Sequence, residues 1–158
     1  MTDLPVDVIR SKKRKRTSQA YVTGGRVRVL IPAHLSTDEE ATVVAELVQK
    51  VTRKLESQTV DLEERAREVA KKYGLPTPTR VEWSQRQNLR WGSCSPQAGT
   101  IRISSRLAGV PGWVIDWVLV HELAHLEVAG HGERFKSLVS RYELRERAEG
   151  YLIAKSEG

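Results

Sequence analysis

The chain has 158 residues, of which 39% are hydrophobic and 29% are charged, the ordinary balance of a globular protein with one compact core. Its single cysteine excludes an internal disulfide, and its opening residues lack the apolar segment of a secretory signal. The most apolar stretch, residues 110–129, is interrupted by acidic and histidine side chains, which excludes a membrane span. We therefore expect a cytoplasmic protein that folds as a single domain over residues 1–158.

The net charge of +6 is concentrated at the N-terminus. Residues 1–35 hold eight Lys or Arg and two Asp, so this segment accounts for the whole excess and the remainder is neutral. Five of these cations form the run "KKRKR" at residues 12–16. If that run lies on a strand, alternation sends its side chains to opposite faces and splits the cluster. Weak nucleic-acid association through this basic lobe is a hypothesis, although no nucleic-acid-binding motif accompanies it.

The first elements predicted along the chain are a β-hairpin and two helices. Alternating Val and Ile in "VRVLI" predict a strand over residues 27–31, and the preceding Gly24-Gly25 pair predicts a tight turn. The stretch "STDE" at residues 36–39 is a capping box, and an amphipathic pattern follows it. A second helix is expected over residues 61–74, where an Asp starts it and a Gly ends it.

The second half of the chain is expected to contain strands followed by helices. Two strand-like runs, residues 80–85 and 100–105, flank a stretch that reads as a loop. A helix is expected to begin after Pro111 and to pass through His125, and a shorter helix is expected to start near Gly132. This order indicates an α+β fold in which a small, mainly antiparallel sheet packs on helices.

The stretch "HELAHLEVAGH", which starts at His121, contains three of the four histidines. On a helix, His121 and His125 lie one turn apart with Glu122 beside them, and two imidazoles at this spacing bind one Zn²⁺ at about 2.0–2.1 Å each. On a continuous helix His131 would lie roughly 9 Å further along the axis, out of reach of the metal. Gly130 supplies a left-handed turn that aims His131 back at the ion. We therefore predict one Zn²⁺ per chain, held by these histidines.

Three nitrogen ligands leave the fourth position of a tetrahedral zinc ion open to water, as in catalytic sites. The metal acidifies that water, and Glu122 is placed to take its proton as general base and to return a proton to the leaving amine. The oxyanion needs a further donor, and Arg90, Arg134 and Tyr142 are candidates by chemistry alone. Glu127 points away from the side of the helix that carries the histidines, so we do not expect it to bind the metal.

Four stretches, "RWGSCS", "IRIS", "VIDWVLVHELAHL" and "HGERFKSLV", together resemble the YgjP-like metallopeptidases, relatives of the SprT/Spartan and Wss-type zinc proteases. The segments "VIRSKKRKRTSQAYV" and "RVRVLIP" resemble the opening β-hairpin of that family. The resemblance implies a zincin-like fold with the HExxH helix at its centre, in which His121, His125 and His131 hold zinc and Glu122 is catalytic. Val128 stands where metzincins have a glycine, so the turn differs from theirs.

The resemblance also implies that a strand before the zinc helix borders the substrate cleft. The run at residues 100–105 is the candidate, with Ile101 and Ile103 as substrate contacts, and an extended peptide would pair with its edge. Trp91 is expected near the same cleft. The single domain is then expected to comprise a basic β-hairpin lobe (1–35), a helical segment (36–74) and a zinc-binding catalytic core (79–158).

The leading hypothesis is a zinc-dependent metallohydrolase that cleaves proteins or peptides. One alternative keeps zinc but hydrolyses nucleoside triphosphates, since some YgjP-like members are described as nucleotide pyrophosphatases. Two features disfavour this nucleotide alternative: the chain has no Gly-rich phosphate loop, and its predicted metal ligands are nitrogen atoms, which suit Zn²⁺ better than Mg²⁺. Another alternative is a DNA-associated protease of the SprT/Spartan type. A non-enzymatic binding module with structural zinc would require a fourth protein ligand, and Cys94 is expected to be a buried apolar side chain instead.

Overall fold

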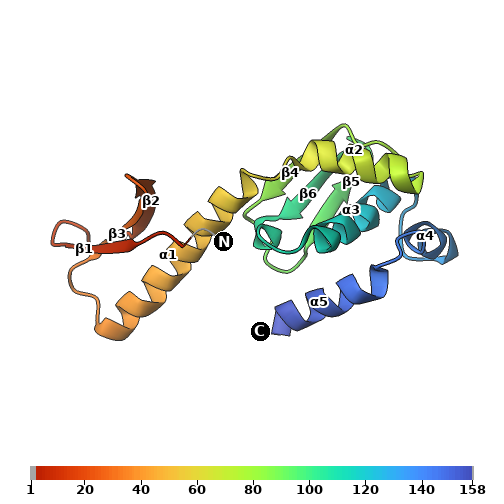
Figure 1. Cartoon of the computed structure of the whole chain (residues 1–158). Helices are drawn as coiled ribbons and strands as arrows, with labels where there is room; N and C mark the ends of the chain where they lie inside the picture. The colour runs from red at the N-terminus through yellow and green to blue at the C-terminus, as the bar shows by residue number, and fades with distance from the viewer. Residues whose placement is uncertain (1–2, 158) are drawn as a thin grey trace. The chain divides into compact units, whose positions relative to one another are not determined.

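The computed structural model describes residues 3–157, and its contacts divide the chain into two units at Thr59 and Val60 (Figure 1). The helical segment expected over residues 36–74 is therefore shared between the units. The organisation of the whole chain as one domain stays a prediction. Within residues 3–157, no helix combines the length and the apolar character that crossing a bilayer requires.

The first unit contains a three-stranded sheet made of β1 (Val6–Ser11), β2 (Gln19–Thr23) and β3 (Arg26–Pro32), in the order β1-β3-β2. β2 and β3 form the predicted antiparallel hairpin, whereas β1 runs parallel to β3. Gly24 and Gly25 form its two-residue turn with φ values of 57° and 70°. Two successive positive φ values match the twist of the flanking strands, and glycine adopts them without steric cost.

α1 (Thr37–Ser57) begins at the predicted capping box, in which the Ser36 side chain accepts from the Glu39 amide and the Glu39 carboxylate accepts from the Ser36 amide. Its apolar face covers one side of the sheet, over the alternating buried side chains of β3. The basic run lies in the loop between β1 and β2 rather than on a strand. Strand alternation therefore does not divide these cations between two faces.

The second unit begins with α2 (Leu62–Tyr73), which starts where the Asp61 side chain accepts from a backbone amide and ends at Gly74 with a left-handed φ of 63°. Both ends are as predicted. A second sheet follows, made of β4 (Arg80–Ser84), β5 (Gly92–Ser95) and β6 (Thr100–Ser104).

The strand order of this second sheet is β4-β6-β5, with β6 parallel to β4 and antiparallel to β5. The expectation that residues 100–105 offer a free edge is wrong, because β6 is paired on both sides. The edge strands are β4 and β5. β5 lies in the stretch that was expected to be a loop. The sequence "GSCS" did not indicate a strand because it has neither apolar alternation nor β-branched residues.

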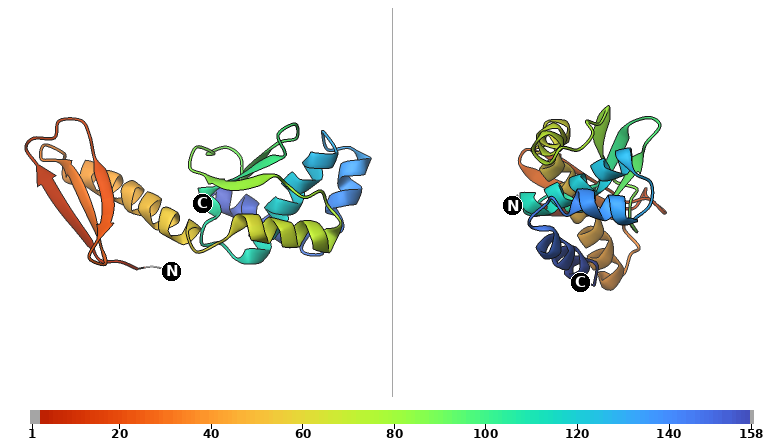
Figure 2. Two further views of the ribbon diagram at one scale, coloured as in Figure 1. Left: turned by 90° about the horizontal axis from the view of Figure 1, so that it is seen from above. Right: turned by 90° about the vertical axis from the view of Figure 1, so that its right-hand side faces the viewer.

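α3 (Gly112–Glu127) starts directly after Pro111, packs against β5, β6 and α2, and supplies much of the core of the second unit (Figure 2). A short 3-10 turn, η1 (Ser105–Leu107), precedes it, and α4 (Glu133–Val139) and α5 (Arg145–Glu157) follow it. The expected α+β class with the HExxH helix central to its unit is confirmed. Each sheet, however, has one parallel and one antiparallel pair. The buried residues of α3 are Val114, Ile115, Trp117, Val118, Leu119, Val120, Glu122, Leu123 and Ala124.

Candidate metal centre

Three histidines converge at the end of α3. His121 and His125 lie on the helix, and His131 lies between α3 and α4. The ligand nitrogens of the three side chains all lie within 4.8 Å of one another, and the Nε2 atoms of His125 and His131 are 3.2 Å apart. Two nitrogens bound to one tetrahedral zinc ion at about 2.05 Å would be separated by about 3.3 Å. The spacing therefore fits a shared metal ion.

The turn after α3 brings His131 to this position. The helix ends at Glu127, the next residue is extended, and Gly130 has the predicted left-handed conformation with a φ of 76°. The Val128 carbonyl lies 3.1 Å from Nδ1 of His125. Because a carbonyl only accepts, this contact favours the tautomer with the proton on Nδ1, which leaves the lone pair of a neutral imidazole on Nε2, the atom that faces His131.

Phe135 packs against all three histidines from the first turns of α4. Its ring centroid lies 5.0 Å from that of His121, 4.5 Å from that of His125 and 4.8 Å from that of His131. Burial lowers the pKa of His121 to about 4, and the neighbouring histidines add to this effect. His121 is therefore neutral at pH 7 and has a lone pair to offer. Phe135 belongs to the stretch "HGERFKSLV", which carries part of the family resemblance, but no local pattern predicted this contact.

Glu122 adjoins the histidines and is 6% exposed. Burial raises the pKa of its carboxyl to about 7, and the positive charge of Arg90 acts in the opposite direction. β5 approaches this side chain closely: a Cβ at Gly92 would lie 3.1 Å from both Cγ and Oε1 of Glu122 and 3.0 Å from Cγ1 of Val118. Only a residue without a side chain leaves the carboxylate in this place.

The histidines and Glu122 border a cavity of about 670 Å³. Its floor is α3, which includes Trp117. One wall is β5 with the loop before it, from Arg90 to Cys94. Glu149 and Leu152, both on α5, form part of a further wall. All of these elements belong to the second unit.

Residues 56–145, more than half of the chain, match the family model described as YgjP-like, metallopeptidase domain. The chain belongs to the YgjP-like metallopeptidase family. It is thus a metal-dependent hydrolase of peptide bonds, and the predicted family and enzyme class are confirmed. None of the curated proteins matches this YgjP-like chain.

Two solved structures share the fold of this YgjP-like protein. The metallopeptidase zymogen abylysin of Pyrococcus abyssi aligns with a TM-score of 0.55 at 22% identity, over 61% of this chain and 96% of abylysin. The metallopeptidase zymogen jannalysin of Methanocaldococcus jannaschii aligns with a TM-score of 0.51 at 16% identity, over 61% of this chain and 97% of jannalysin. At these identities the likeness establishes the fold alone.

The structure brings two of the candidate substrate contacts to the cavity of the YgjP-like domain. Arg90 and Trp91 both line it. Arg106, in η1, holds the loop that carries them: its guanidinium donates to the carbonyls of Gln87 at 3.2 Å and Arg90 at 3.0 Å and lies 4.1 Å from the Trp91 ring centroid. This anchor was not predictable from local patterns, because the loop residues that Arg106 contacts lie at least fifteen positions before it.

Four other candidates lie elsewhere in the domain. Ile101 and Ile103 are fully buried in the central strand β6. The Arg134 side chain is exposed and pairs with Glu127 at 3.1 Å. Tyr142 is buried, and its hydroxyl donates to a backbone carbonyl of α3. None of these four side chains lines the cavity.

Cys94 is half-buried rather than fully buried, and it lines the cavity from β5. Burial raises the pKa of its thiol to about 11, and the negative charge of Glu122 adds to the effect. At neutral pH the side chain is therefore a neutral thiol, which has little nucleophilic character. Its packing against the core agrees with the apolar role expected from the sequence.

Proposed function

We propose that this metallopeptidase uses Zn²⁺ held by His121, His125 and His131, and that Glu122 transfers the protons of peptide hydrolysis. The observation that carries the proposal is the convergence of three imidazole nitrogens within 4.8 Å beside a buried carboxylate in one cavity. Location in the cytoplasm is part of the same proposal, on the grounds of composition given above.

The donor set favours zinc in a catalytic arrangement. Imidazole nitrogen is a preferred ligand of Zn²⁺, whereas Mg²⁺ and Ca²⁺ prefer oxygen. Among residues 3–157, no fourth His, Cys, Asp or Glu joins the group. Structural zinc sites are normally closed by four protein ligands, so a three-ligand site supports catalysis over a structural role.

The residues of this chain then divide the work of hydrolysis. A zinc ion, when bound, is a Lewis acid that polarises the scissile carbonyl and acidifies water. The Glu122 carboxylate accepts the proton of the attacking water and delivers it to the nitrogen of the leaving amine. Gly92 lets β5 lie against this carboxylate and keeps it in place. Val128 fixes the tautomer and orientation of His125.

The substrate strand is proposed to pair with β5 instead of β6. β5 is an edge strand and lines the cavity, so its free backbone groups are available to an extended peptide. Arg90 is the candidate anion-binding side chain for the reaction, because it lines the cavity and its charge acts on Glu122. Arg134 and Tyr142 are not retained for this role, since neither reaches the cavity.

Two variants test the zinc and proton-transfer roles. Glu122→Gln should retain about one zinc ion per chain and lose cleavage of a denatured protein, with kcat falling by at least about a hundredfold. His125→Ala should lose the metal, as measured by elemental analysis after dialysis. Glu127→Gln is the matched control, because it removes a carboxylate from the same helix outside the cavity. A zinc-loaded Glu122→Gln variant with normal turnover would contradict the role of Glu122.

The nucleotide alternative is tested in the same preparation. Family membership favours a protein or peptide substrate over a nucleoside triphosphate. We therefore expect the zinc-loaded protein to cleave denatured protein in a Glu122-dependent manner and to release no pyrophosphate from nucleoside triphosphates. Release of pyrophosphate that disappears in Glu122→Gln would assign the site to nucleotides instead.

A further inference from the structure

We propose that the α5 wall of the cavity is a specificity subsite, which selects a long basic side chain of the substrate next to the scissile bond. The inference rests on the proposed peptidase function and names a substrate class for it. Three residues carry it: Glu149 and Leu152 of α5, and Trp117 of α3, all of which line the cavity.

Glu149 presents an uncompensated carboxylate at this wall. The side chain is exposed, and within residues 3–157 it has no hydrogen bond and no ion pair. Its neighbours on α5 are engaged: Ala148 is fully buried, and the guanidinium of Arg147 lies 4.8 Å from the Trp113 ring centroid. Because Glu149 and Leu152 are three positions apart, the helix presents both on the same side.

Trp117 connects this wall to the metal centre. It is 5% exposed, and its ring lies edge-on to that of His121 with the centroids 5.9 Å apart. A substrate side chain that contacts Trp117 in the cavity would therefore belong to a residue flanking the scissile bond. The apolar surfaces of the two residues suit the methylene stem of Lys or Arg, and the Glu149 carboxylate suits its cationic head.

The cavity carries charges of opposite sign on two of its walls, Glu149 on α5 and Arg90 before β5. Arg90 lines it from the loop before β5, and its guanidinium forms no hydrogen bond or salt bridge within the described residues. A cation in the cavity is repelled by Arg90 and attracted by Glu149, which directs a basic side chain to α5. An acidic side chain is directed the opposite way.

The subsite is measured by binding, with no need for turnover. The probes are fluorescent pentapeptides of alanine in which one position is Lys, norleucine or Glu, and the protein is the zinc-loaded Glu122→Gln form. At one position we expect the Lys peptide to bind roughly three- to fivefold more tightly than the norleucine peptide, as for a solvent-accessible ion pair. Adding Glu149→Gln should bring the Lys to norleucine ratio close to unity, and Glu149→Lys should make the Glu peptide bind more tightly than the Lys peptide.

Glu146→Gln is the matched control, since it removes the same charge from the same helix outside the cavity and should keep the preference for Lys. A Lys to norleucine ratio that Glu149→Gln leaves unchanged, or that is near unity at every position, would overturn the subsite. Failure of the peptidase function is a separate result. It would appear as zinc-loaded wild-type protein that cleaves none of the peptides although they bind with the Glu149-dependent ratio.

Discussion

Gly92 shows how a residue without a side chain can position the proposed general base, Glu122. The β5 backbone at this point lies so close to α3 that a Cβ would come within 3.1 Å of the Glu122 carboxylate and 3.0 Å of Val118. Real Cβ atoms rarely approach neighbours so closely, so one of the two side chains would have to move. Val118 is buried in the core and has little room, so we expect Glu122 to move instead.

Gly92→Ala should therefore reduce activity more than stability. A shift of a few tenths of an ångström moves the carboxylate away from the reacting water, and we expect kcat/KM to fall by about tenfold, since misplacement by about 1 Å can cost about a hundredfold. Zinc content should stay unchanged, because the three atoms nearest to the added Cβ belong to Val118 and Glu122 and not to the histidines. The measurement is peptide cleavage together with elemental analysis, and Ser95→Ala at the exposed end of β5 is the control. Wild-type kcat/KM in Gly92→Ala would refute the positioning role.

At the scale of secondary structure elements, the turn between α3 and α4 brings the third histidine, His131, to the candidate metal site. Gly130 adopts a left-handed φ of 76° with open space around it, so its role is conformational. Gly132, two residues later, also has open space but a φ of −75°. Because an added Cβ would clash with nothing at either position, alanine substitutions at the two glycines compare a left-handed φ with an ordinary one.

Gly130→Ala should lower the free energy of unfolding of the zinc-loaded protein by about 1 kcal/mol, the cost of a left-handed residue that carries a Cβ. Gly132→Ala should cost less, about 0.5 kcal/mol, because its φ is accessible to alanine and only the N-cap preference for glycine over alanine is lost. Urea denaturation of the two variants in excess zinc gives the comparison. Equal effects at the two positions would show that the turn does not require a left-handed residue.

Elements with strong local signals were predictable from the sequence. Caps define the starts of α1 and α2, Gly24 and Gly25 define the hairpin, and the histidine spacing on α3 defined the candidate metal ligands. β5 was not predictable, because four small or polar residues form a strand here only through pairing with β6. The strand order is set by long-range contacts, and so is the position of α5 at the cavity. Glu149 therefore had no local signal of a role in the site.

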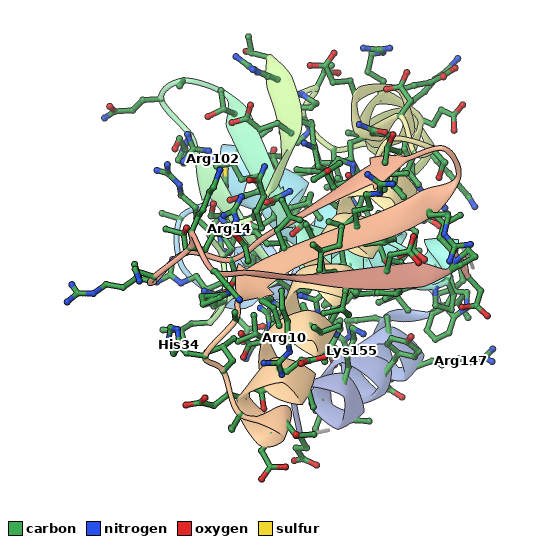
Figure 3. All side chains as sticks on the ribbon, turned by 90° about the vertical axis from the view of Figure 1, so that its left-hand side faces the viewer. Arg10, Arg14, His34, Arg102, Arg147 and Lys155 are labelled. Atoms are coloured by element: carbon green, nitrogen blue, oxygen red, sulfur yellow. The ribbon has the colours of Figure 1, made fainter. Side chains whose placement is uncertain are left out.

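At the scale of the whole molecule, the net charge and the candidate metal centre belong to different units. Every residue that lines the cavity lies in the unit that begins at Val60. The first 35 residues carry the net charge of +6. Figure 3 labels two cations of this segment, Arg10 and Arg14. Arg10 donates to the carbonyls of Ala33 at 2.9 Å and Leu35 at 2.8 Å and pairs with Glu40, so its role is structural.

The β1–β2 loop contains several cations that remain available to a partner. Arg14 donates to Thr17 and Gln19, both at 3.2 Å. Its neighbours Lys13 and Lys15 are exposed and form no ion pair within residues 3–157. A loop with several solvent-exposed cations fits the phosphates of a nucleic-acid backbone in a manner independent of sequence.

We therefore predict weak, salt-dependent binding of duplex DNA through this loop. Each phosphate contact contributes about 0.9 to the slope of log K against log salt, so Lys13→Ala combined with Lys15→Ala should reduce the slope by up to about two. Lys50→Ala combined with Lys54→Ala removes the same charge from exposed positions of α1 in the same unit and should leave the slope unchanged. Fluorescence anisotropy at several salt concentrations measures both. Equal losses in the two double variants would mean that net charge, and not the loop, attracts DNA, and no binding at low salt would remove the nucleic-acid hypothesis.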